Sequence, residues 1–312
     1  MKAAIIEHYG SPDEFKIKEL PTPEIDKGEI LIRNRASSVN PIDTIVRKGT
    51  VKLVSGLIGD QLLGSDFSGT VLATKSKRFK VGDEVFGLNS AIKGGSYAEE
   101  IVADAEHAAL KPASLSFAEA ASLPLVGLTA WQGMVDDGKL RAGDRILITG
   151  CTGGVGFVAV QIAKALGAHV TGTCSAKHVE FAKSLGTDEV IAYDQAGVPK
   201  NQKFDLIFDA SGHYTISDMK ENLTDEAMFV TTKAGADSLK GAFKAATDMI
   251  FQKRMKIVRM DMDDDDLEKL AELVNEGKLK IHIAKTFPLA QIAAAHRMLE
   301  DESFLGKIAI EI

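Results

Sequence analysis

The segment of the chain best suited to chemistry is a glycine-rich turn, Gly-Cys-Thr-Gly-Gly-Val-Gly, at residues 150–156. An apolar run at residues 146–148 precedes it, and apolar residues four positions apart, at 158, 162 and 166, follow it. This order predicts a buried strand, a turn and a helix, with free backbone N–H groups at the helix N-terminus. Such a helix start binds phosphate groups, so the segment predicts a dinucleotide-binding turn rather than an ordinary glycine-rich loop.

The positions within this turn have different expected tasks. Gly153 would let the backbone approach a pyrophosphate, and Gly156 would let the helix pack closely against the strand. Cys151 replaces the usual first glycine of the G-x-G-x-x-G pattern, and Gly150 is expected to supply the tight turn instead. The Cys151 thiol is expected near the pyrophosphate, where it would be either inert or oxidisable. The predicted cofactor contacts of the turn are Cys151, Thr152, Gly153, Gly154, Val155 and Gly156.

Strands and helices alternate after Arg145, which predicts a parallel sheet with helices on its faces. The expected strands span residues 145–149, 169–174, 189–192, 204–209 and 227–232. The strand at 204–209 runs into a loop of the kind that binds ligands in such sheets, so Ser211 and Gly212 are further predicted cofactor contacts.

The first 119 residues follow a different pattern, with short strand candidates at 29–36 and 66–73 and frequent glycine turns. Long helical periodicity is absent there, which predicts a mainly-β, barrel-like domain. Helices are expected at 117–123, 128–136 and 289–300, and a last strand at 306–312. The aspartates at 261–266 could be metal ligands, but leucines at helical spacing follow them, so we expect a solvated linker and a helix start.

Composition limits the possible functions. A chain of 312 residues suits about two domains, and its net charge of −7 offers no basic field for nucleic acid or an anionic membrane. No apolar stretch reaches the roughly 20 residues of a membrane span. The only two cysteines, Cys151 and Cys174, argue against a disulfide framework and a cysteine-based zinc lobe. A reducing, cytoplasmic location is the default expectation.

The residues after the second expected strand indicate which dinucleotide is bound. Enzymes that prefer NAD place a carboxylate there, but no Asp or Glu occurs between Gly156 and Val179. Hydroxyl and ammonium groups would instead favour a 2′-phosphate, so Ser175 and Lys177 predict NADPH as the preferred cofactor. The alternative is that Lys177 and His178 only begin an exposed helix.

Six motifs then occur in order along the chain: Asn40-Pro41-Ile42-Asp43 with Arg47 and Gly49, residues 64–69, 81–85 and 127–130, the glycine turn, and Gly306-Lys307-Ile308. Together they resemble the zinc-independent quinone oxidoreductase branch of the medium-chain dehydrogenase/reductase superfamily. The resemblance implies an α/β protein with a GroES-like, mainly-β catalytic domain, residues 1–119 and 260–312. It also implies a Rossmann NADP-binding domain, a doubly wound parallel sheet, at residues 120–259, and an active site in the cleft between the two.

The resemblance also bears on metal binding. Zinc alcohol dehydrogenases of the same superfamily bind catalytic zinc through a cysteine, a histidine and a further ligand. Here Asn40 stands at the cysteine position, and Ser65-Asp66 stands where that branch has histidine followed by glutamate. Without a thiolate or an imidazole the usual zinc ligands are missing, so no metal site is expected.

The implied reaction is transfer of a hydride from NADPH to a quinone or an α,β-unsaturated carbonyl compound. For an enone, the hydride goes to the β-carbon and the enolate oxygen needs a hydrogen-bond donor. Asn40 is the candidate donor, and Asp43 and Arg47 of the same loop are further catalytic candidates; a structural salt bridge or turn cap is the alternative for these two. By resemblance, Thr129 would lie near the nicotinamide, unless its hydroxyl only caps a helix, and Tyr193 near the 2′-phosphate.

The chain departs from the family where relatives often carry a tyrosine after the Arg-x-Gly of this loop, since Thr50 stands there. Tyr97 is the remaining family tyrosine in this half of the chain, with packing alone as the alternative role, so no general acid is predicted. The apolar residues 51–59 suggest a small, hydrophobic, electron-poor substrate. Two other functions stay open: an enoyl-thioester reductase of acyl chain metabolism and a non-catalytic NADPH-binding sensor. The family further implies a homodimer.

Overall fold

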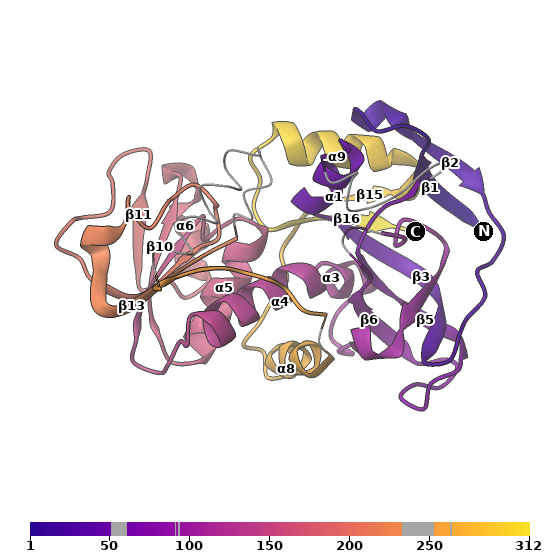
Figure 1. Ribbon diagram of the computed structural model, residues 1–312, viewed down its shortest axis with the longest axis horizontal. Helices are drawn as coiled ribbons and strands as arrows, with labels where there is room; N and C mark the ends of the chain where they lie inside the picture. The colour runs from indigo at the N-terminus through magenta and orange to yellow at the C-terminus, as the bar shows by residue number, and fades with distance from the viewer. Residues whose placement is uncertain (51–60, 91, 93, 233–252, 263) are drawn as a thin grey trace. The chain divides into compact units, whose positions relative to one another are not determined.

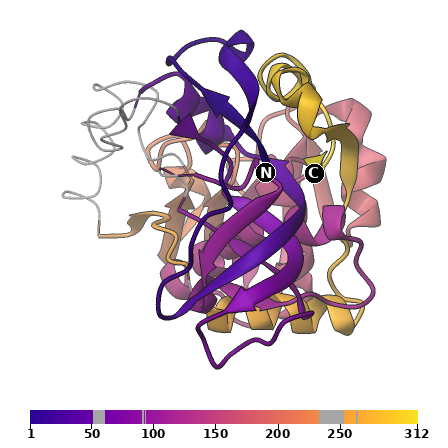
Figure 2. The ribbon, with the colours of Figure 1, turned by 90° about the vertical axis from the view of Figure 1, so that its right-hand side faces the viewer.

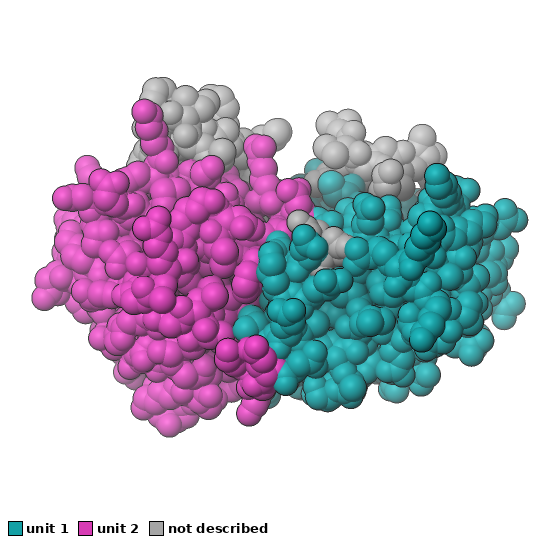
Figure 3. Space-filling model, turned by 90° about the horizontal axis from the view of Figure 1, so that it is seen from below, with its two compact units in different colours: residues 1–125, 262–275, 281–312 teal, residues 126–261, 276–280 magenta. Residues whose placement is uncertain are grey.

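The computed structural model describes all residues except 51–60, 91, 93, 233–252 and 263. The chain forms two compact units, coloured separately in Figure 3. Unit 1 contains residues 1–125, 262–275 and 281–312, and unit 2 contains residues 126–261 and 276–280. Residues 276–280 belong to unit 2 because the side chain of Gln161 binds both the N–H and the carbonyl oxygen of Lys280.

Unit 2 is built on a six-stranded parallel sheet in the order β11-β10-β9-β12-β13-β14 (Figure 1). The strands are β9 (Arg145–Thr149), β10 (His169–Cys174), β11 (Glu189–Ala192), β12 (Phe204–Asp209), β13 (Leu223–Thr231) and β14 (Met255–Ile257). Numbered by their order in the chain, the strands lie in the order 3-2-1-4-5-6. Successive strands are therefore added on one side of β9 up to β11 and on the other side from β12 onward, which makes the boundary between β9 and β12 a switch point. Ligands bind at such a switch point, beyond the carboxyl ends of the strands.

Among the described residues of unit 2, helix α5 (Gly154–Ala165) follows β9 and helix α6 (Val179–Ser184) follows β10. Helix α4 (Pro124–Trp131) begins in unit 1, continues into unit 2 and runs into a π-helical turn at Gln132–Asp137. Eight residues of α5 from Gly156 to Ala163 are buried, and all are apolar or small except Gln161, whose side chain binds the main chain of Lys280. Gly167, with φ of 83°, follows the end of the helix in the left-handed conformation.

Unit 1 contains two sheets, and both termini lie in it (Figure 2). Three strands form an antiparallel sheet in the order β2-β1-β4: β1 (Lys2–Ile6), β2 (Phe15–Glu19) and β4 (Gln61–Leu62). The larger sheet has the order β15-β16-β3-β5-β6-β8, and β7 also pairs with β3. Its strands are β3 (Glu29–Val39), β5 (Asp66–Thr74), β6 (Glu84–Leu88), β7 (Glu100–Asp104), β8 (Ala108–Leu110), β15 (Ile283–Pro288) and β16 (Lys307–Glu311).

Strand β3 organises unit 1 because it pairs antiparallel with β5, β7 and the C-terminal strand β16. The α-helices in the described part of this unit include α1 (Pro41–Arg47), α3 (Phe117–Ala121), α8 (Asp264–Asn275) and α9 (Ile292–Asp301). The pairing of β16 with β3 brings Ile308 opposite Val39. The first residue of β16, Lys307, thereby lies beside the start of α1, and the last residue, Ile312, lies beside Arg35.

The predicted fold class, a GroES-like mainly-β part with a Rossmann parallel sheet, is confirmed. The first four strands predicted after residue 144 have the expected bounds, but β13 begins four residues earlier than predicted, at Leu223. Its first half carries the exposed residues Asp225 and Glu226, which hide the apolar pattern of a strand. The helix expected at 128–136 begins earlier, at Pro124, because proline is tolerated in a first helical turn. The aspartate run leads into α8 as expected.

Candidate functional site

The glycine turn lies at the carboxyl end of β9, next to the switch point of the unit 2 sheet. Gly150 has a φ of 61°, which favours glycine, and its carbonyl oxygen accepts a hydrogen bond of 3.0 Å from Gly153 N–H. A Cβ atom at Gly156 would lie 2.1 Å from the Gly150 carbonyl oxygen. No side chain fits at Gly156, because the helix presses directly against the turn.

Gly153 differs from Gly156, because the folded protein leaves room for a side chain at Gly153. A Cβ atom at Gly153 would meet only the Gly150 carbonyl oxygen, at an ordinary contact distance of 3.5 Å, and its φ of −81° suits any residue. Gly153 is the N-cap of α5, and no side chain caps this helix start. The turn therefore keeps space and free N–H groups at the helix N-terminus, as a bound pyrophosphate requires.

A buried carboxylate, Asp209, joins the ends of three neighbouring strands beside this turn. Its Oδ1 atom accepts hydrogen bonds from the hydroxyls of Thr149, at 2.6 Å, and Ser211, at 2.8 Å. Its Oδ2 atom accepts from the Thr231 hydroxyl at 3.0 Å and the Tyr214 N–H at 3.2 Å. Ser211 is thus held near the glycine turn, and the next residue, Gly212, has a φ of 65°.

The predicted 2′-phosphate contacts lie just beyond β10. Ser175 precedes a 3₁₀ turn at Ala176–His178, and its hydroxyl lies 3.2 Å from His178 Nδ1. Lys177 is exposed, and Tyr193 is 56% exposed with its N–H bound to the Cys174 carbonyl oxygen. The structure thus places Ser175, Lys177 and Tyr193 in one region, at the ends of two adjacent parallel strands.

A carboxylate also lies in this region, and the sequence analysis did not consider it. Asp194 Oδ1 accepts a hydrogen bond of 2.9 Å from Ala176 N–H, between Ser175 and Lys177. The carboxylate expected in NAD-preferring enzymes follows the second strand, between Gly156 and Val179, whereas Asp194 follows the third strand, so its position in the chain did not indicate it. The pairing of β10 with β11 was the signal that could have found it.

The two cysteines meet beneath the turn. Cys151 is fully buried, its N–H binds the Thr173 carbonyl oxygen at 2.9 Å, and its side chain lies over Gly172. The Cys151 thiol hydrogen-bonds to Cys174, which raises the pKa of Cys151, as burial does, and lowers the pKa of Cys174. Since Cys151 points into the sheet and not toward the space above Gly153, its backbone is the part available to a ligand.

In unit 1, the predicted loop residues Asn40 and Asp43 form the N-terminus of α1. Asn40 N–H binds Asp43 Oδ2 at 2.8 Å, and the two residues form a capping box. Asp43 Oδ2 also accepts 2.9 Å from the Tyr97 hydroxyl, and Ser65 Oγ lies 3.4 Å from Asp43 Oδ1. Burial raises the pKa of Asp43 to about 7, although these hydrogen bonds oppose the shift.

Asn40 itself is fully buried between an ammonium group and a carboxylate. Its Nδ2 donates to Asp66 Oδ2 at 2.8 Å, and Ser38 Oγ lies 3.5 Å from Nδ2. Lys307 Nζ donates to Asn40 Oδ1 at 2.5 Å and to the Val39 carbonyl oxygen at 3.2 Å. The amide proposed as an enolate donor is therefore already engaged by Asp66, and direct donation to a substrate stays a prediction.

Arg47 is fully buried at the end of α1 and binds Glu300 of α9 at 2.7 Å through Nη2. Its Nε and Nη1 atoms have no hydrogen-bond partner among the residues described, and neither does either ring nitrogen of the buried His296. The His296 ring packs edge-on against Phe15 and Tyr97. Burial and the neighbouring Arg47 charge lower the pKa of His296 to about 3, so this ring is neutral.

The structure thus brings Asn40 and Asp43 together, and Arg47 lies one helical turn after Asp43. Within unit 2 it gathers the glycine turn, Ser211 and Gly212 at the ends of adjacent strands. Thr129 lies almost buried on α4. Sequence reasoning missed Lys307 and His296 as members of the unit 1 cluster, and it left open whether Tyr97 does more than pack; the Tyr97 hydroxyl binds Asp43.

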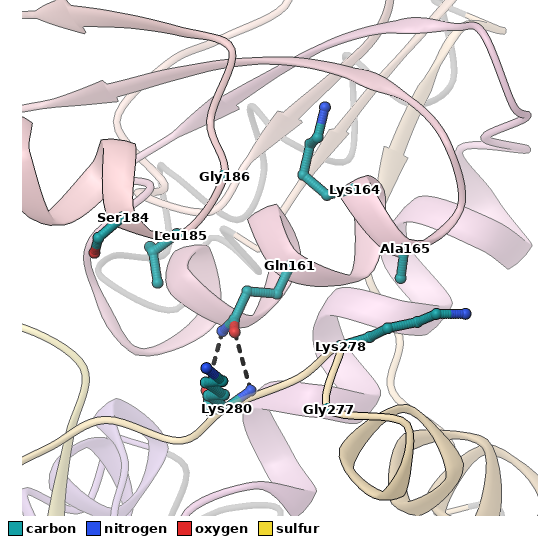
Figure 4. A pocket seen from close by; sticks show the side chains of 9 residues that line it. All are labelled: Gln161, Lys164, Ala165, Ser184, Leu185, Gly186, Gly277, Lys278 and Lys280. Atoms are coloured by element: carbon teal, nitrogen blue, oxygen red, sulfur yellow. Dashed lines mark hydrogen bonds between the residues drawn. The ribbon is translucent and has the colours of Figure 1, made fainter.

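A separate pocket of about 430 Å³ lies in unit 2, at the C-terminal end of α5 and so at the far end of this helix from the glycine turn. In Figure 4 the Gln161 side chain points to the main chain of Lys280, and the side chains of Lys164 and Lys278 extend away from it. Lys164 binds Asp188 and Lys278 binds Glu276. This pocket therefore has no part in the proposed nucleotide site.

Over the described part of the chain, no group of three or more His, Cys, Asp or Glu side chains is arranged to hold a metal ion. A search of the same residues finds no helix with the length and apolar character needed to cross a membrane.

A six-stranded parallel sheet in this order, with a glycine turn at its switch point, defines a dinucleotide-binding α/β protein. Two family profiles match the chain: the alcohol dehydrogenase GroES-like domain over residues 26–113 and the zinc-binding dehydrogenase over residues 185–310. The second description names a zinc-binding dehydrogenase; that Asn40 and Ser65 stand at the zinc-ligand positions stays a prediction from the sequence.

Two plant proteins illustrate the relatives. The chloroplast envelope quinone oxidoreductase homolog of Arabidopsis thaliana is 32% identical over 307 residues, covering 94% of this chain and 92% of that protein. The chloroplastic NADPH-dependent alkenal/one oxidoreductase of the same organism is 31% identical, covering 99% of this chain and 79% of that protein.

Two solved structures show the same fold over the whole chain. The quinone oxidoreductase of Coxiella burnetii matches with a TM-score of 0.87 and 30% identity, covering 100% of this chain and 99% of that one. The Escherichia coli quinone oxidoreductase complexed with NADPH matches with a TM-score of 0.85 and 25% identity, covering 100% of both chains. The chain belongs to the zinc-independent quinone oxidoreductase branch of the medium-chain dehydrogenase/reductase superfamily. It is therefore an oxidoreductase of a family that uses a nicotinamide cofactor.

Proposed function

We propose that this protein transfers a hydride from NADPH to a quinone or an α,β-unsaturated carbonyl compound without a metal ion. The observation that carries the proposal is the glycine turn, in which Gly153 is required by no contact of the protein and leaves the start of α5 open to a pyrophosphate. The named activities of the relatives, a quinone oxidoreductase homolog and an alkenal/one oxidoreductase, support the class of acceptor.

The residues present fit a nicotinamide dinucleotide. Within residues 151–156, the backbone N–H groups at the start of α5 would hold the pyrophosphate, whereas the N–H groups of Cys151 and Gly153 bind the carbonyl oxygens of Thr173 and Gly150. Ser211 and Gly212 would contact the cofactor beside the switch point. Ser175, Lys177 and Tyr193 would contact the 2′-phosphate, and Thr129 would lie near the nicotinamide. The bound nicotinamide supplies the hydride, and the protein supplies position and charge.

The preference for NADPH rests on the Ser175 hydroxyl and the exposed Lys177 ammonium. Asp194 acts against this preference, because its carboxylate binds the N–H of Ala176, the residue between Ser175 and Lys177 in the chain, and would repel a nearby 2′-phosphate. We propose that the preference survives because the Asp194 carboxylate is already bound to Ala176 N–H. Changing Ser175→Asp should lower kcat/KM for NADPH much more than for NADH. Equal kcat/KM values for the two cofactors in the wild type would contradict the assignment.

On the substrate side, Asn40, Asp43 and Arg47 are the proposed functional residues. The Asn40 amide could donate to a substrate oxygen only by giving up its hydrogen bond to Asp66 or its contact with Ser38. Asp43 and Arg47 would support it by fixing α1, through the capping box and the bond to Glu300. The apolar residues 51–59, from which a hydrophobic substrate was predicted, lie outside the described residues.

The deciding experiment is steady-state oxidation of NADPH with a small quinone and a small enone, followed at 340 nm. Turnover with either acceptor, unaffected by a chelator, is expected. A strong preference for coenzyme A or acyl-carrier thioesters would favour the enoyl-thioester reductase instead, and tight NADPH binding without any turnover would favour the sensor. A homodimer and a cytoplasmic location remain predictions; the relatives named above are chloroplast proteins.

A further inference from the structure

The proposal concerns Lys307, which no motif argument placed in the site. Lys307 is the first residue of β16 and is only 3% exposed. The antiparallel register, with Ile308 opposite Val39, puts Lys307 across from Asn40 although 267 positions separate them in the chain. A buried ammonium group is costly unless it is paired and hydrogen-bonded, so its partners determine what it does.

Those partners form one continuous unit. The Lys307 ammonium donates to Asn40 Oδ1, Asn40 Nδ2 donates to Asp66 Oδ2, and Lys307 Nζ lies 3.9 Å from that same oxygen. An ammonium group can only donate and a carboxylate can only accept, so the two charges dictate which end of the amide faces which partner. Lys307 thereby prevents the Asn40 amide from flipping.

Asp66 has a second bond that matters for function. Its Oδ1 atom accepts from Leu125 N–H at 2.9 Å, at the start of α4, the helix that carries Thr129. Its Oδ2 atom also accepts from Ser38 Oγ at 2.5 Å. Both oxygens therefore accept hydrogen bonds, the arrangement that an ionised carboxylate satisfies best. Burial raises the pKa of Asp66, and the positive charge of Lys307 is the largest effect that opposes this shift.

We propose that Lys307 is a positioning residue: its charge keeps Asp66 an acceptor on both oxygens, so that Asp66 holds the Asn40 amide and the start of α4 together. The inference rests on the proposed function for its effect on turnover, but not for the contacts themselves. Loss of the ammonium would let Asp66 take a proton, and one of its acceptor oxygens would become a donor.

The test compares the wild type with Lys307→Met, Asp66→Asn and the double variant; Lys285→Met, on an exposed lysine of β15, is the matched control. Lys307→Met should lower kcat for quinone and enone by about 10- to 100-fold, as loss of supporting contacts around a site does. The Kd for NADPH and the KM for the acceptor should stay within about twofold, because the cofactor residues are elsewhere. The control should behave as the wild type.

The double variant supplies the sharper result. If Lys307 acts by keeping Asp66 charged, adding Asp66→Asn to Lys307→Met should lower neither kcat nor the urea midpoint of unfolding any further. Additive losses, or a folded Lys307→Met variant with kcat within twofold of the wild type, would overturn the proposal. Should Lys307→Met fail to fold, the double variant, which carries no unpaired buried charge, should fold better; if it does not, the proposal is wrong.

Failure of the proposed function would appear differently. A wild type that turns over neither acceptor refutes that function, and the urea midpoints of the same four proteins then decide alone whether Lys307 and Asp66 act as a unit.

Discussion

The two candidate sites of this protein are built in opposite ways. In unit 2 the proposed nucleotide site consists of consecutive residues, 150–156, in which glycines leave space and backbone N–H groups are proposed to bind the pyrophosphate. In unit 1 the polar residues are mostly buried and are held by side-chain contacts: Lys307, Asn40 and Asp66 form one hydrogen-bonded group, and Arg47 of α1 pairs with Glu300 of α9. The glycine turn leaves space for a ligand beside its backbone, whereas the polar side chains of unit 1 already bind one another.

The difference shows how each site would respond to mutation. At the glycine turn the available space decides the outcome. A methyl group added there destabilises the fold where it would overlap the backbone and leaves stability unchanged where it meets open space. In the unit 1 cluster, charge is the critical quantity, because a buried charge that loses its partner is costly whatever its volume. Four substitutions test this contrast, from the largest expected effect to the smallest.

Gly156→Ala should be the most damaging change. Its Cβ atom would lie 2.1 Å from the Gly150 carbonyl oxygen, a backbone atom that cannot move aside without opening the turn. We expect a loss of about 3 kcal/mol in the free energy of unfolding, measured by urea denaturation. Gly197→Ala is the control, since a Cβ atom there would meet nothing within 4 Å. A stable Gly156→Ala variant would show that helix α5 is not held against the turn.

His296→Phe should change the pH dependence of stability. Because the pKa of His296 is lowered to about 3 in the folded protein, protonation in the unfolded chain reduces stability as the pH falls below about 6.5. The buried neutral ring therefore costs no stability above pH 6.5, and by pH 5 it lowers the free energy of unfolding by about 2 kcal/mol. The variant should lose less stability than the wild type between pH 7.5 and pH 5.

The measurement is urea unfolding at both pH values, and the difference between variant and wild type cancels the other titrating groups. His8→Gln, at an exposed histidine of the same unit, should follow the wild-type curve. Identical pH dependence of His296→Phe and wild type would mean that the ring is accessible to protons in the folded state.

Gly153→Ala separates binding from folding. The methyl group would contact the protein only at 3.5 Å, so the unfolding curve should match the wild type. It would project into the space assigned to the pyrophosphate, and we expect NADPH to bind about tenfold more weakly, or by ~1.4 kcal/mol. The Kd from cofactor fluorescence is the readout. Unchanged affinity would move the pyrophosphate away from this residue.

Asp194→Asn is expected to have the smallest effect and the opposite sign. The amide oxygen can still accept from Ala176 N–H, but the negative charge beside the 2′-phosphate is removed. NADPH should bind about threefold more tightly, in line with single exposed charges, and NADH should be unaffected. Glu226→Gln removes the same charge elsewhere in unit 2 and should change neither Kd. Weaker NADPH binding in Asp194→Asn would place the ribose phosphate elsewhere.

What sequence reasoning could reach follows from how far each signal extends along the chain. The strand, the turn and α5 are consecutive, so glycine spacing and apolar periodicity were enough to predict them. The capping box of Asn40 and Asp43 is equally local, although it was considered only as an alternative to catalysis. Asp194 was missed because it approaches Ala176 only through the pairing of two parallel strands.

The sequence by itself therefore identified the family and predicted the nucleotide-binding turn and the loss of the usual zinc ligands, because these inferences depend on residue types at fixed positions along the chain. The tertiary structure decided the state of the side chains. It set Lys307 against Asn40 through the pairing of β16 with β3, buried His296 between two aromatic rings, and brought the Cys151 and Cys174 thiols into contact. Burial and charge neighbours depend on every segment packed around a residue, and no local pattern in the chain contains that information.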